Sequence, residues 1–172
     1  MDNPSLIEIS KLTKEQLLDL IKINSRNWNT LDGLWFSAVE EKFGLEAALE
    51  LDILMWKTGS LIEAKRIKEL LNINKGGLPN IMKTINLMSW APSLGYEYEI
   101  TDKNAVWTCT RCLPQEKRVE IGKGEFPCKP TFEACFGNVC KVIDPQVTVS
   151  CTFCPPDPHP DDAWCQWEFN IR

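Results

Sequence analysis

The stretch VTVSCTFCPPDPHPDDAWCQWEFNI, residues 147–171, does most to decide how this chain folds. Apolar and polar residues alternate up to Cys151 and alternate again from Cys165 onwards, a pattern that predicts two β-strands. Cys151 and Cys154 form a Cys-x-x-Cys pair where the first of these strands ends. Because such a turn directs two thiolates towards one point, the stretch also indicates a metal site beside the strands.

The eight cysteines of the chain all lie between Cys109 and Cys165, and residues 1–108 contain none. The first ten residues are too polar for the apolar part of a secretory signal, so we expect a cytoplasmic protein. In that reducing compartment, a high density of cysteine favours metal binding or redox chemistry. A set of disulfides is the alternative that this argument disfavours.

Helical signals dominate the part of the chain that lacks cysteine. Thr13 and Gln16 form a capping box, so a helix is expected to begin there and to be interrupted at Gly44. A second helix is expected over residues 45–71 and a third from Pro79. Apolar residues recur along the first helix at the spacing of a face that packs against a core: Leu17, Ile21, Trp28, Leu31, Trp35, Val39 and Phe43.

After these helices the apolar period changes to that of strands. Residues 96–100 and 105–109 predict a β-hairpin, and residues 130–141 predict a short helix before the two final strands. The predicted fold class is therefore α+β, with N-terminal antiparallel helices packed on a C-terminal antiparallel β-sheet that includes a short crossover helix. We expect a helical region over 1–92 and a cysteine-rich region over 93–172, which together form one compact, metal-stapled domain.

Charge and hydropathy exclude two classes of partner. The formal net charge is −5 and Lys and Arg are not clustered, which argues against nucleic acid. No apolar run approaches the roughly 18 residues of a membrane span, so no membrane partner is expected. A small molecule is the expected partner.

Residue spacing alone leaves two sets of four metal ligands. One set joins the two Cys-x-x-Cys pairs and consists of Cys109, Cys112, Cys151 and Cys154. The other set consists of Cys128, Cys151, Cys154 and Cys165. Four thiolates leave no position open for water, so either set indicates a structural metal rather than a catalytic one. Zinc is favoured by ligand type, and an iron–sulfur cluster is the alternative because it too takes four thiolates.

A family resemblance appears at these residues. The segment from Cys128 through Cys151-Thr152-Phe153-Cys154 to Cys165-Gln166-Trp167-Glu168-Phe169 resembles the C-terminal half of the 4-vinyl-reductase-like ligand-sensing domain. The resemblance implies that the second set of cysteines holds zinc, with Cys151 in place of a glutamate of that family. The loop from Cys154 to Cys165 is longer here than the usual loop of the family.

The whole chain is also similar to proteins described as L-2-amino-thiazoline-4-carboxylic acid hydrolase-like. This similarity rests on residues 28–44, on Glu125-Phe126-Pro127-Cys128 and on the final Trp-Cys-x-Trp-Glu-Phe motif. Together the two resemblances imply a homodimer. They also imply either a sensor-like protein that binds a small ligand or a hydrolase of a small heterocycle or amide.

Aromatic and polar residues on the helices are the candidates for a ligand site. We predict a ligand pocket formed by Trp28, Asp32, Trp35 and Trp56. If the protein is an enzyme, its candidate base or nucleophile is Asp32, Glu40 or Cys112, although no spacing distinguishes them. A thiol redox role of Cys109 with Cys112 is a further alternative.

Three residues have a simpler interpretation. Cys135 and Cys140 lie on the predicted helix over 130–141 and are expected to be small buried hydrophobic residues. His159 is the only histidine and lies in a stiff, proline-rich loop, where we expect it to be exposed and without a role in a site.

Overall fold

The structure of the chain is a computed structural model that describes residues 3–171. Its first half is helical: α1 (Pro4–Ser10), α2 (Lys14–Phe43), α3 (Leu45–Leu70), α4 (Leu78–Ile85) and the 3-10 helix η1 (Ala91–Ser93). Its second half contains β1 (Gly95–Ile100), β2 (Asn104–Arg111), α5 (Leu113–Glu120), α6 (Lys129–Ile143), β3 (Val147–Phe153) and β4 (Cys165–Ile171). The predicted α+β class is confirmed. Within residues 3–171, no helix combines the length and the apolar character that crossing a membrane requires.

The two long helices begin and end where the sequence indicates. The Thr13 hydroxyl accepts a hydrogen bond from the Gln16 amide at 3.2 Å, and the Gln16 side chain accepts one from the Thr13 amide at 2.9 Å. This capping box satisfies two backbone donors at the start of α2. Gly44 has a φ of 89°, a left-handed conformation that glycine adopts without strain. It ends α2 and lets the chain reverse directly into α3.

The four strands form one antiparallel sheet in the order β1-β2-β4-β3. On one face, Trp107, Trp167 and Phe169 are fully buried. The residues between them on the strands, such as Thr108 and Glu168, point to the other face and are half-exposed. This alternation is typical of an antiparallel sheet that covers a core with one side only.

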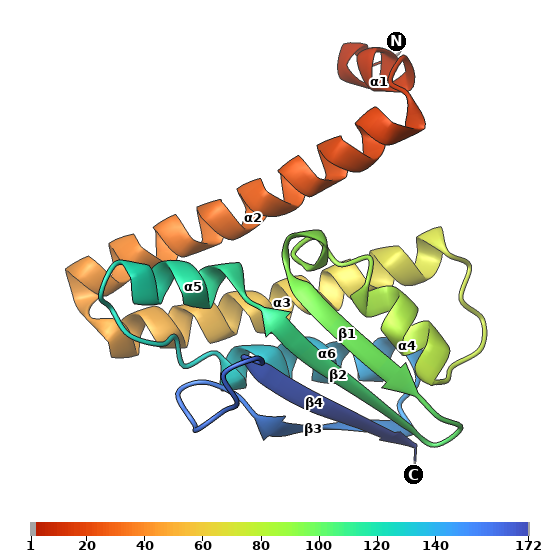
Figure 1. Cartoon of the computed structure of the whole chain (residues 1–172). Helices are drawn as coiled ribbons and strands as arrows, with labels where there is room; N and C mark the ends of the chain where they lie inside the picture. The colour runs from red at the N-terminus through yellow and green to blue at the C-terminus, as the bar shows by residue number, and fades with distance from the viewer. Residues whose placement is uncertain (1–2, 172) are drawn as a thin grey trace.

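Helix α6 fills the space between the sheet and α3 (Figure 1). Its Phe136 is fully buried, with its ring centroid 5.4 Å from that of Trp107 and 5.3 Å from that of Trp167. Residues of α3 and α4, including Ala64 and Ile81, belong to the same buried cluster. The helical half and the cysteine-rich half therefore share one hydrophobic core.

The apolar face that we predicted for α2 is mostly not in the core, which corrects the sequence interpretation. Exposed fractions are 52% for Ile21, 67% for Leu31 and 72% for Trp35, and only Val39 of that stripe is buried. The first turns of α2 extend away from the remainder of the chain together with α1 (Figure 1), and no side chain of residues 14–24 is buried. Apolar spacing identified the helix but could not show which of its faces has a partner.

Two short helices were not predicted. The sequence indicated strand–strand–helix–strand–strand for the second half, whereas α5 lies between β2 and α6, and α1 precedes α2. Helix α5 has the sequence LPQEKRVE, whose polar composition gives no helical hydrophobic period. Its start is favoured by a proline in the first turn, where the missing amide hydrogen costs nothing.

Candidate functional site

Five cysteines from four segments of the chain meet at one end of the sheet. Cys109 lies near the end of β2 and Cys112 directly follows that strand, Cys128 precedes α6, Cys154 follows β3, and Cys165 begins β4. We call these five residues the thiol cluster. The sheet register places the Cys109 and Cys165 backbones opposite one another, so the antiparallel pairing of β2 and β4 itself brings two of the thiols together.

The thiols of the cluster touch one another in a row. The sulfur atoms of Cys128 and Cys154 are 3.4 Å apart. Cys165 lies close enough to both Cys154 and Cys109 for these thiols to influence one another's pKa, and Cys112 does the same for Cys109. Cys109, Cys128, Cys154 and Cys165 are all buried, with at most 6% of each residue exposed.

These contacts give the thiols of the cluster different pKa values. Hydrogen bonding from Cys109 and then from Cys154 lowers the pKa of Cys165 to about 4. Contact with Cys112 and Cys165 raises the pKa of Cys109, and contact with Cys128 and Cys165 raises the pKa of Cys154. One thiolate at the centre of the row therefore accepts hydrogen bonds from the thiols on either side of it.

Cys151, which belongs to both predicted ligand sets, lies outside this row. It is half-buried on β3 and makes no hydrogen bond to another thiol within residues 3–171. Burial raises the pKa of the Cys151 thiol to about 11, against the opposing charge of Lys129, and the charge of Cys165 raises it further. The structure thus brings together three members of each predicted set and leaves Cys151 to one side.

The arrangement of the cluster can be compared with what a tetrahedral metal requires. With zinc–sulfur bonds of about 2.3 Å, sulfur atoms on a tetrahedron are about 3.8 Å apart. The 3.4 Å between the Cys128 and Cys154 sulfurs is close to that spacing. No group of three or more Cys, His, Asp or Glu side chains between residues 3 and 171 already surrounds a common point as metal ligands do. Coordination would therefore require the thiols to rotate from a row to a tetrahedron.

Cys135 and Cys140 are buried, which confirms the prediction, whereas His159 is half-buried and not exposed, which corrects it. Cys135 and Cys140 are buried on α6, and burial raises the pKa of each thiol. His159 is half-buried, with its Nε2 3.3 Å from Glu125 Oε1 and its ring centroid 5.3 Å from that of Trp164. The proline-rich loop is thus packed against the segment before α6, which the composition of the loop did not indicate.

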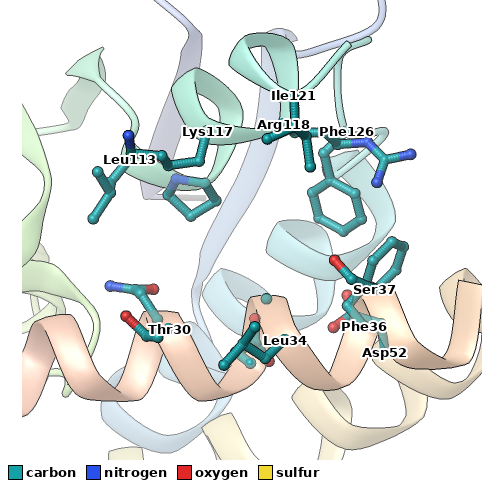
Figure 2. Close-up of a pocket in the computed structure, with 14 residues that line it drawn as sticks. Thr30, Leu34, Phe36, Ser37, Asp52, Leu113, Lys117, Arg118, Ile121 and Phe126 are labelled. Atoms are coloured by element: carbon teal, nitrogen blue, oxygen red, sulfur yellow. The ribbon is translucent and has the colours of Figure 1, made fainter. Parts of the chain in front are cut away.

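A pocket with a volume of about 380 Å³ lies between α2 and α5. Figure 2 shows Leu34 and Phe36 of α2 on one side, with Lys117 of α5 and the nearby Phe126 on the other. The Phe36 and Phe126 rings meet edge to face with centroids 4.8 Å apart. The volume is within the range of small-molecule sites in proteins, which are mostly apolar with a few polar groups.

Two carboxyl groups lie at the base of this pocket, Asp32 from α2 and Asp52 from α3. Asp52 is only 7% exposed, and its Oδ2 accepts a hydrogen bond from the Thr131 hydroxyl at 2.8 Å. The Trp56 indole donates towards both carboxyls. Burial, together with the charge of Asp52, raises the pKa of Asp32 to about 7, and burial raises the pKa of Asp52 to about 6. The pair therefore holds about one proton near neutral pH.

At the rim of the pocket the charged groups neutralise one another. Arg118 donates two hydrogen bonds to Glu40, at 2.7 and 2.9 Å, and Lys123 donates a third at 2.9 Å. Hydrogen bonding from Arg118 contributes most to lowering the pKa of Glu40 to about 2. A carboxylate held this firmly in its ionised form is a poor general base at neutral pH, which disfavours Glu40 as a catalytic residue.

The pocket and the thiol cluster are joined by one buried side chain. Gln115 of α5, 1% exposed, accepts a hydrogen bond from the Phe126 amide and donates one to the Phe126 carbonyl, both at 2.7 Å. The side-chain nitrogen of Gln115, Nε2, also lies 3.4 Å from the Cys128 sulfur. Residues 113–127, which form one wall of the pocket, lie between Cys112 and Cys128. Gln115 ties the start of this segment to its end at Phe126 and to Cys128.

The four residues predicted to form the pocket have different positions. Asp32 lines the pocket, and with Trp35 and Asp52 it lines a smaller adjoining space of about 30 Å³. Trp28 and Trp56 are not among the residues that line the pocket; their ring centroids are 6.5 Å apart, and Trp56 is the one beside the carboxyls. Cys112, the remaining catalytic candidate, belongs to the thiol cluster.

Sequence reasoning missed the residues that complete the pocket. Arg118 and Glu40 are separated by 78 positions, and nothing in one sequence indicates that they pair. Gln115 and Phe126 do have a recognisable signal, because both lie between Cys112 and Cys128, two cysteines that the sequence already marks as candidate metal ligands. A segment between two candidate metal ligands is a good place to look for residues that such a site positions.

The comparisons with known proteins place the chain in a family. A family model described as "Family of unknown function (DUF6125)" matches residues 10–171. The chain belongs to the DUF6125 family. No curated protein and no solved structure shows significant similarity to it. The description of DUF6125 assigns no activity, so the resemblances to ligand-sensing and hydrolase-like proteins stay predictions.

Proposed function

We propose that this DUF6125 protein is a cytoplasmic, zinc-stabilised protein that binds a small ligand. The observation that carries the proposal is the position of residues 113–127, which line the pocket and are bounded by Cys112 and Cys128 of the thiol cluster. A metal held by Cys109 and Cys128 would fix the chain directly after this segment and three residues before Cys112. The metal would then stabilise the fold and, with it, the shape of the ligand pocket.

The four buried thiols are the best set of ligands for zinc. Cys109, Cys128, Cys154 and Cys165 are each in contact with another member of the set, and they come from four different segments. Trp167 supports this choice, because its buried indole N–H finds no oxygen acceptor among residues 3–171 but lies beside the Cys165 sulfur. A metal-bound thiolate at that position is a good acceptor for such a donor. Zinc with four thiolates has no open position, so its role here is structural.

Metal analysis of the intact protein tests this part of the proposal. Protein purified without oxygen is expected to contain one zinc per chain and to be colourless. The variants Cys154→Ser and Cys165→Ser are expected to lose the metal, whereas the matched controls Cys112→Ser and Cys151→Ser keep it. Visible absorption with bound iron would show a cluster in place of zinc. Full metal content in Cys154→Ser and Cys165→Ser would show that the thiol cluster is not the site.

The pocket supports small-ligand binding by its size and lining. Its walls are mainly apolar, while Asp32 and Asp52 supply polar groups at the base. This combination buries the body of a ligand and orients it through a few hydrogen bonds. Saturable binding of small aromatic compounds, measured by calorimetry and weakened by Phe126→Ala with the metal retained, is the expected result. Binding that is unchanged in Phe126→Ala would place the ligand elsewhere.

We also propose that the partner of the projecting helix is a second copy of this chain. Leu18 and Ile21 are 49% and 52% exposed on a part of α2 where no side chain is buried. A helix segment that buries no side chain is only marginally stable in water. Light scattering is expected to give the mass of a dimer for the wild type and of a monomer for Ile21→Glu. A monomeric wild type at high protein concentration would contradict the proposal.

Hydrolysis is a second candidate function, favoured by one observation. The Asp32 carboxyl has a pKa of about 7 and lines the pocket, so it is suited to accept or donate a proton at neutral pH. Consumption of small amides or heterocycles at catalytic protein concentration, abolished in Asp32→Asn, would establish an enzyme. Binding without turnover would leave the ligand-binding function alone.

A further inference from the structure

The base of the pocket is acidic and has no cationic partner. Neither Asp32 nor Asp52 has a Lys, Arg or His nitrogen within 4.0 Å anywhere in residues 3–171. Their partners are the neutral Trp56 indole and, for Asp52, the Thr131 hydroxyl. Buried carboxyls are usually compensated by a positive charge, so this pair has a place for one that the chain does not fill.

The basic side chains at the rim do not supply that charge. Arg118 and Lys123 are both bound to Glu40, with nitrogen–oxygen distances of 2.7 and 2.9 Å. Lys117 forms an ion pair with Glu120 on the exposed side of α5. Because these cations are neutralised by their own partners, the electrostatic potential inside the pocket is set by the two aspartates at its base.

The walls define the second feature of a ligand. Phe36 and Phe126 meet edge to face, and Leu34 and Ile121 also line the space. Apolar and aromatic walls favour a flat apolar body, because contact with them removes apolar surface from water. A ligand that fits both features has an apolar ring at the walls and a positively charged nitrogen at the base.

We propose that the pocket selects small aromatic amines or amidines, whose protonated nitrogen is bound between the Asp32 and Asp52 carboxyls while the ring lies against Phe36 and Phe126. This inference rests on the proposed ligand-binding function and narrows it to one chemical class. The protonated nitrogen donates hydrogen bonds to both carboxylates, which then share its positive charge. The raised pKa values of the free carboxyls are the behaviour expected of an acidic pair that lacks this cation.

A matched set of probes tests the charge requirement on the full-length protein. Benzylamine, benzyl alcohol and benzoate have the same ring and differ in the group that would reach the base of the pocket. Calorimetry at neutral pH is expected to show benzylamine binding at least about tenfold more tightly than benzyl alcohol, with no binding of benzoate. The variants Asp32→Asn and Asp52→Asn, which keep the shape of the side chain, are expected to remove the preference for benzylamine.

The controls separate this inference from the proposed function. Asp19→Asn lies on the same helix but on the surface, where Asp19 pairs with Lys22, and it should bind benzylamine as the wild type does. If benzyl alcohol or benzoate binds as tightly as benzylamine, the pocket binds small molecules but the inferred ligand class is wrong. If none of the three probes binds to the zinc-loaded protein, both the ligand class and the ligand-binding half of the proposed function are wrong. Thermal unfolding of each variant checks that loss of binding does not reflect loss of fold.

Discussion

The thiol cluster and the base of the pocket both bury titratable side chains, but they do so in different ways. In the thiol cluster each sulfur touches another, as Cys128 touches Cys154 at 3.4 Å. In the pocket, Asp32 and Asp52 border a space of about 380 Å³. A cluster closed by its own members suits an ion that stays bound, whereas carboxyls beside an open space suit a ligand that exchanges. The comparison assigns stability to one region and recognition to the other.

The largest effect on stability is expected at the thiol cluster. Cys128→Ser should lose the metal and lower the free energy of unfolding by about 5 kcal/mol or more, because metal binding contributes directly to folding. Chemical denaturation of the metal-loaded protein measures this change. Cys135→Ala, which removes an equally buried thiol outside the cluster, should cost only about 1 kcal/mol. Equal losses in the two variants would remove the distinction between the cluster and ordinary buried cysteines.

A smaller effect is expected at Gln115, which connects the two regions. Gln115→Leu keeps the volume of the side chain but leaves the Phe126 amide without a partner and removes one of two hydrogen bonds to the Phe126 carbonyl, which also accepts from the Cys128 amide. This should cost about 2 kcal/mol of stability. Zinc content should stay at one per chain while ligand affinity falls. Gln166→Leu is the control, because Gln166 makes one hydrogen bond, to Thr108, on the opposite face of the sheet. Unchanged affinity in Gln115→Leu would show that the regions act independently.

The pH dependence of stability is expected to come from the pocket. The pKa of Asp32 is about 7 in the folded chain and 3.8 as its ordinary value, so the folded state holds more protons between these values. Stability therefore falls as the pH rises from about 4 to about 7. Asp32→Asn should flatten this dependence and be more stable than the wild type at pH 8 by roughly 2 kcal/mol. Urea denaturation at pH 5 and pH 8 gives the result.

Other charged groups near this carboxyl do not reverse the sign. Asp52 raises the pKa of Asp32 further, while Arg118 and Lys117 at the rim are paired with Glu40 and Glu120. The control Asp19→Asn should keep the pH dependence of the wild type. If Asp32→Asn also keeps it, Asp32 ionises normally and the pocket is not the source.

The smallest effect is expected at His159, whose ring contacts Glu125 and Trp164. Hydrogen bonding to the Pro160 carbonyl contributes most to raising its pKa, burial acts in the opposite direction, and the contact with Glu125 raises the pKa further. A raised histidine pKa stabilises the fold below the ordinary value of 6.5, and this contribution is lost as the pH rises. His159→Gln should therefore cost at most about 0.5 kcal/mol at pH 5.5 and nothing at pH 8, because the pair is near the surface. A large loss at both pH values would show that the ring is needed for packing.

Much of the fold could be predicted because its signals are local. The capping box at Thr13, the reversal at Gly44 and the alternation on either side of Cys151 and Cys165 each depend on neighbouring residues only. The sheet order and the exposed face of α2 could not be predicted, since both depend on which distant segments pack together. Helix α5 was missed because a short polar helix is held by its surroundings rather than by a hydrophobic period.

Part of the candidate site could also be predicted from local signals, and part could not. Of the four cysteines predicted to converge, Cys128, Cys154 and Cys165 lie together and Cys151 does not, so the spacing of cysteines indicated the place of the cluster but not its members. Cys109 could be preferred to Cys151 only after the register of β2 against β4 was known. The pocket needed the structure as well, because Phe126 reaches Phe36 across 90 positions of sequence.

The segment between Cys112 and Cys128 has a consequence for how members of this family can diverge. The segment is followed directly by the proposed ligand Cys128, and the proposed ligand Cys109 lies three residues before Cys112. Leu113, Lys117 and Ile121 line the pocket without belonging to the buried core. Substitutions at Leu113, Lys117 or Ile121 would reshape the opening without disturbing the sheet. Sequence variation confined to this segment would therefore give relatives that share one scaffold but bind different ligands.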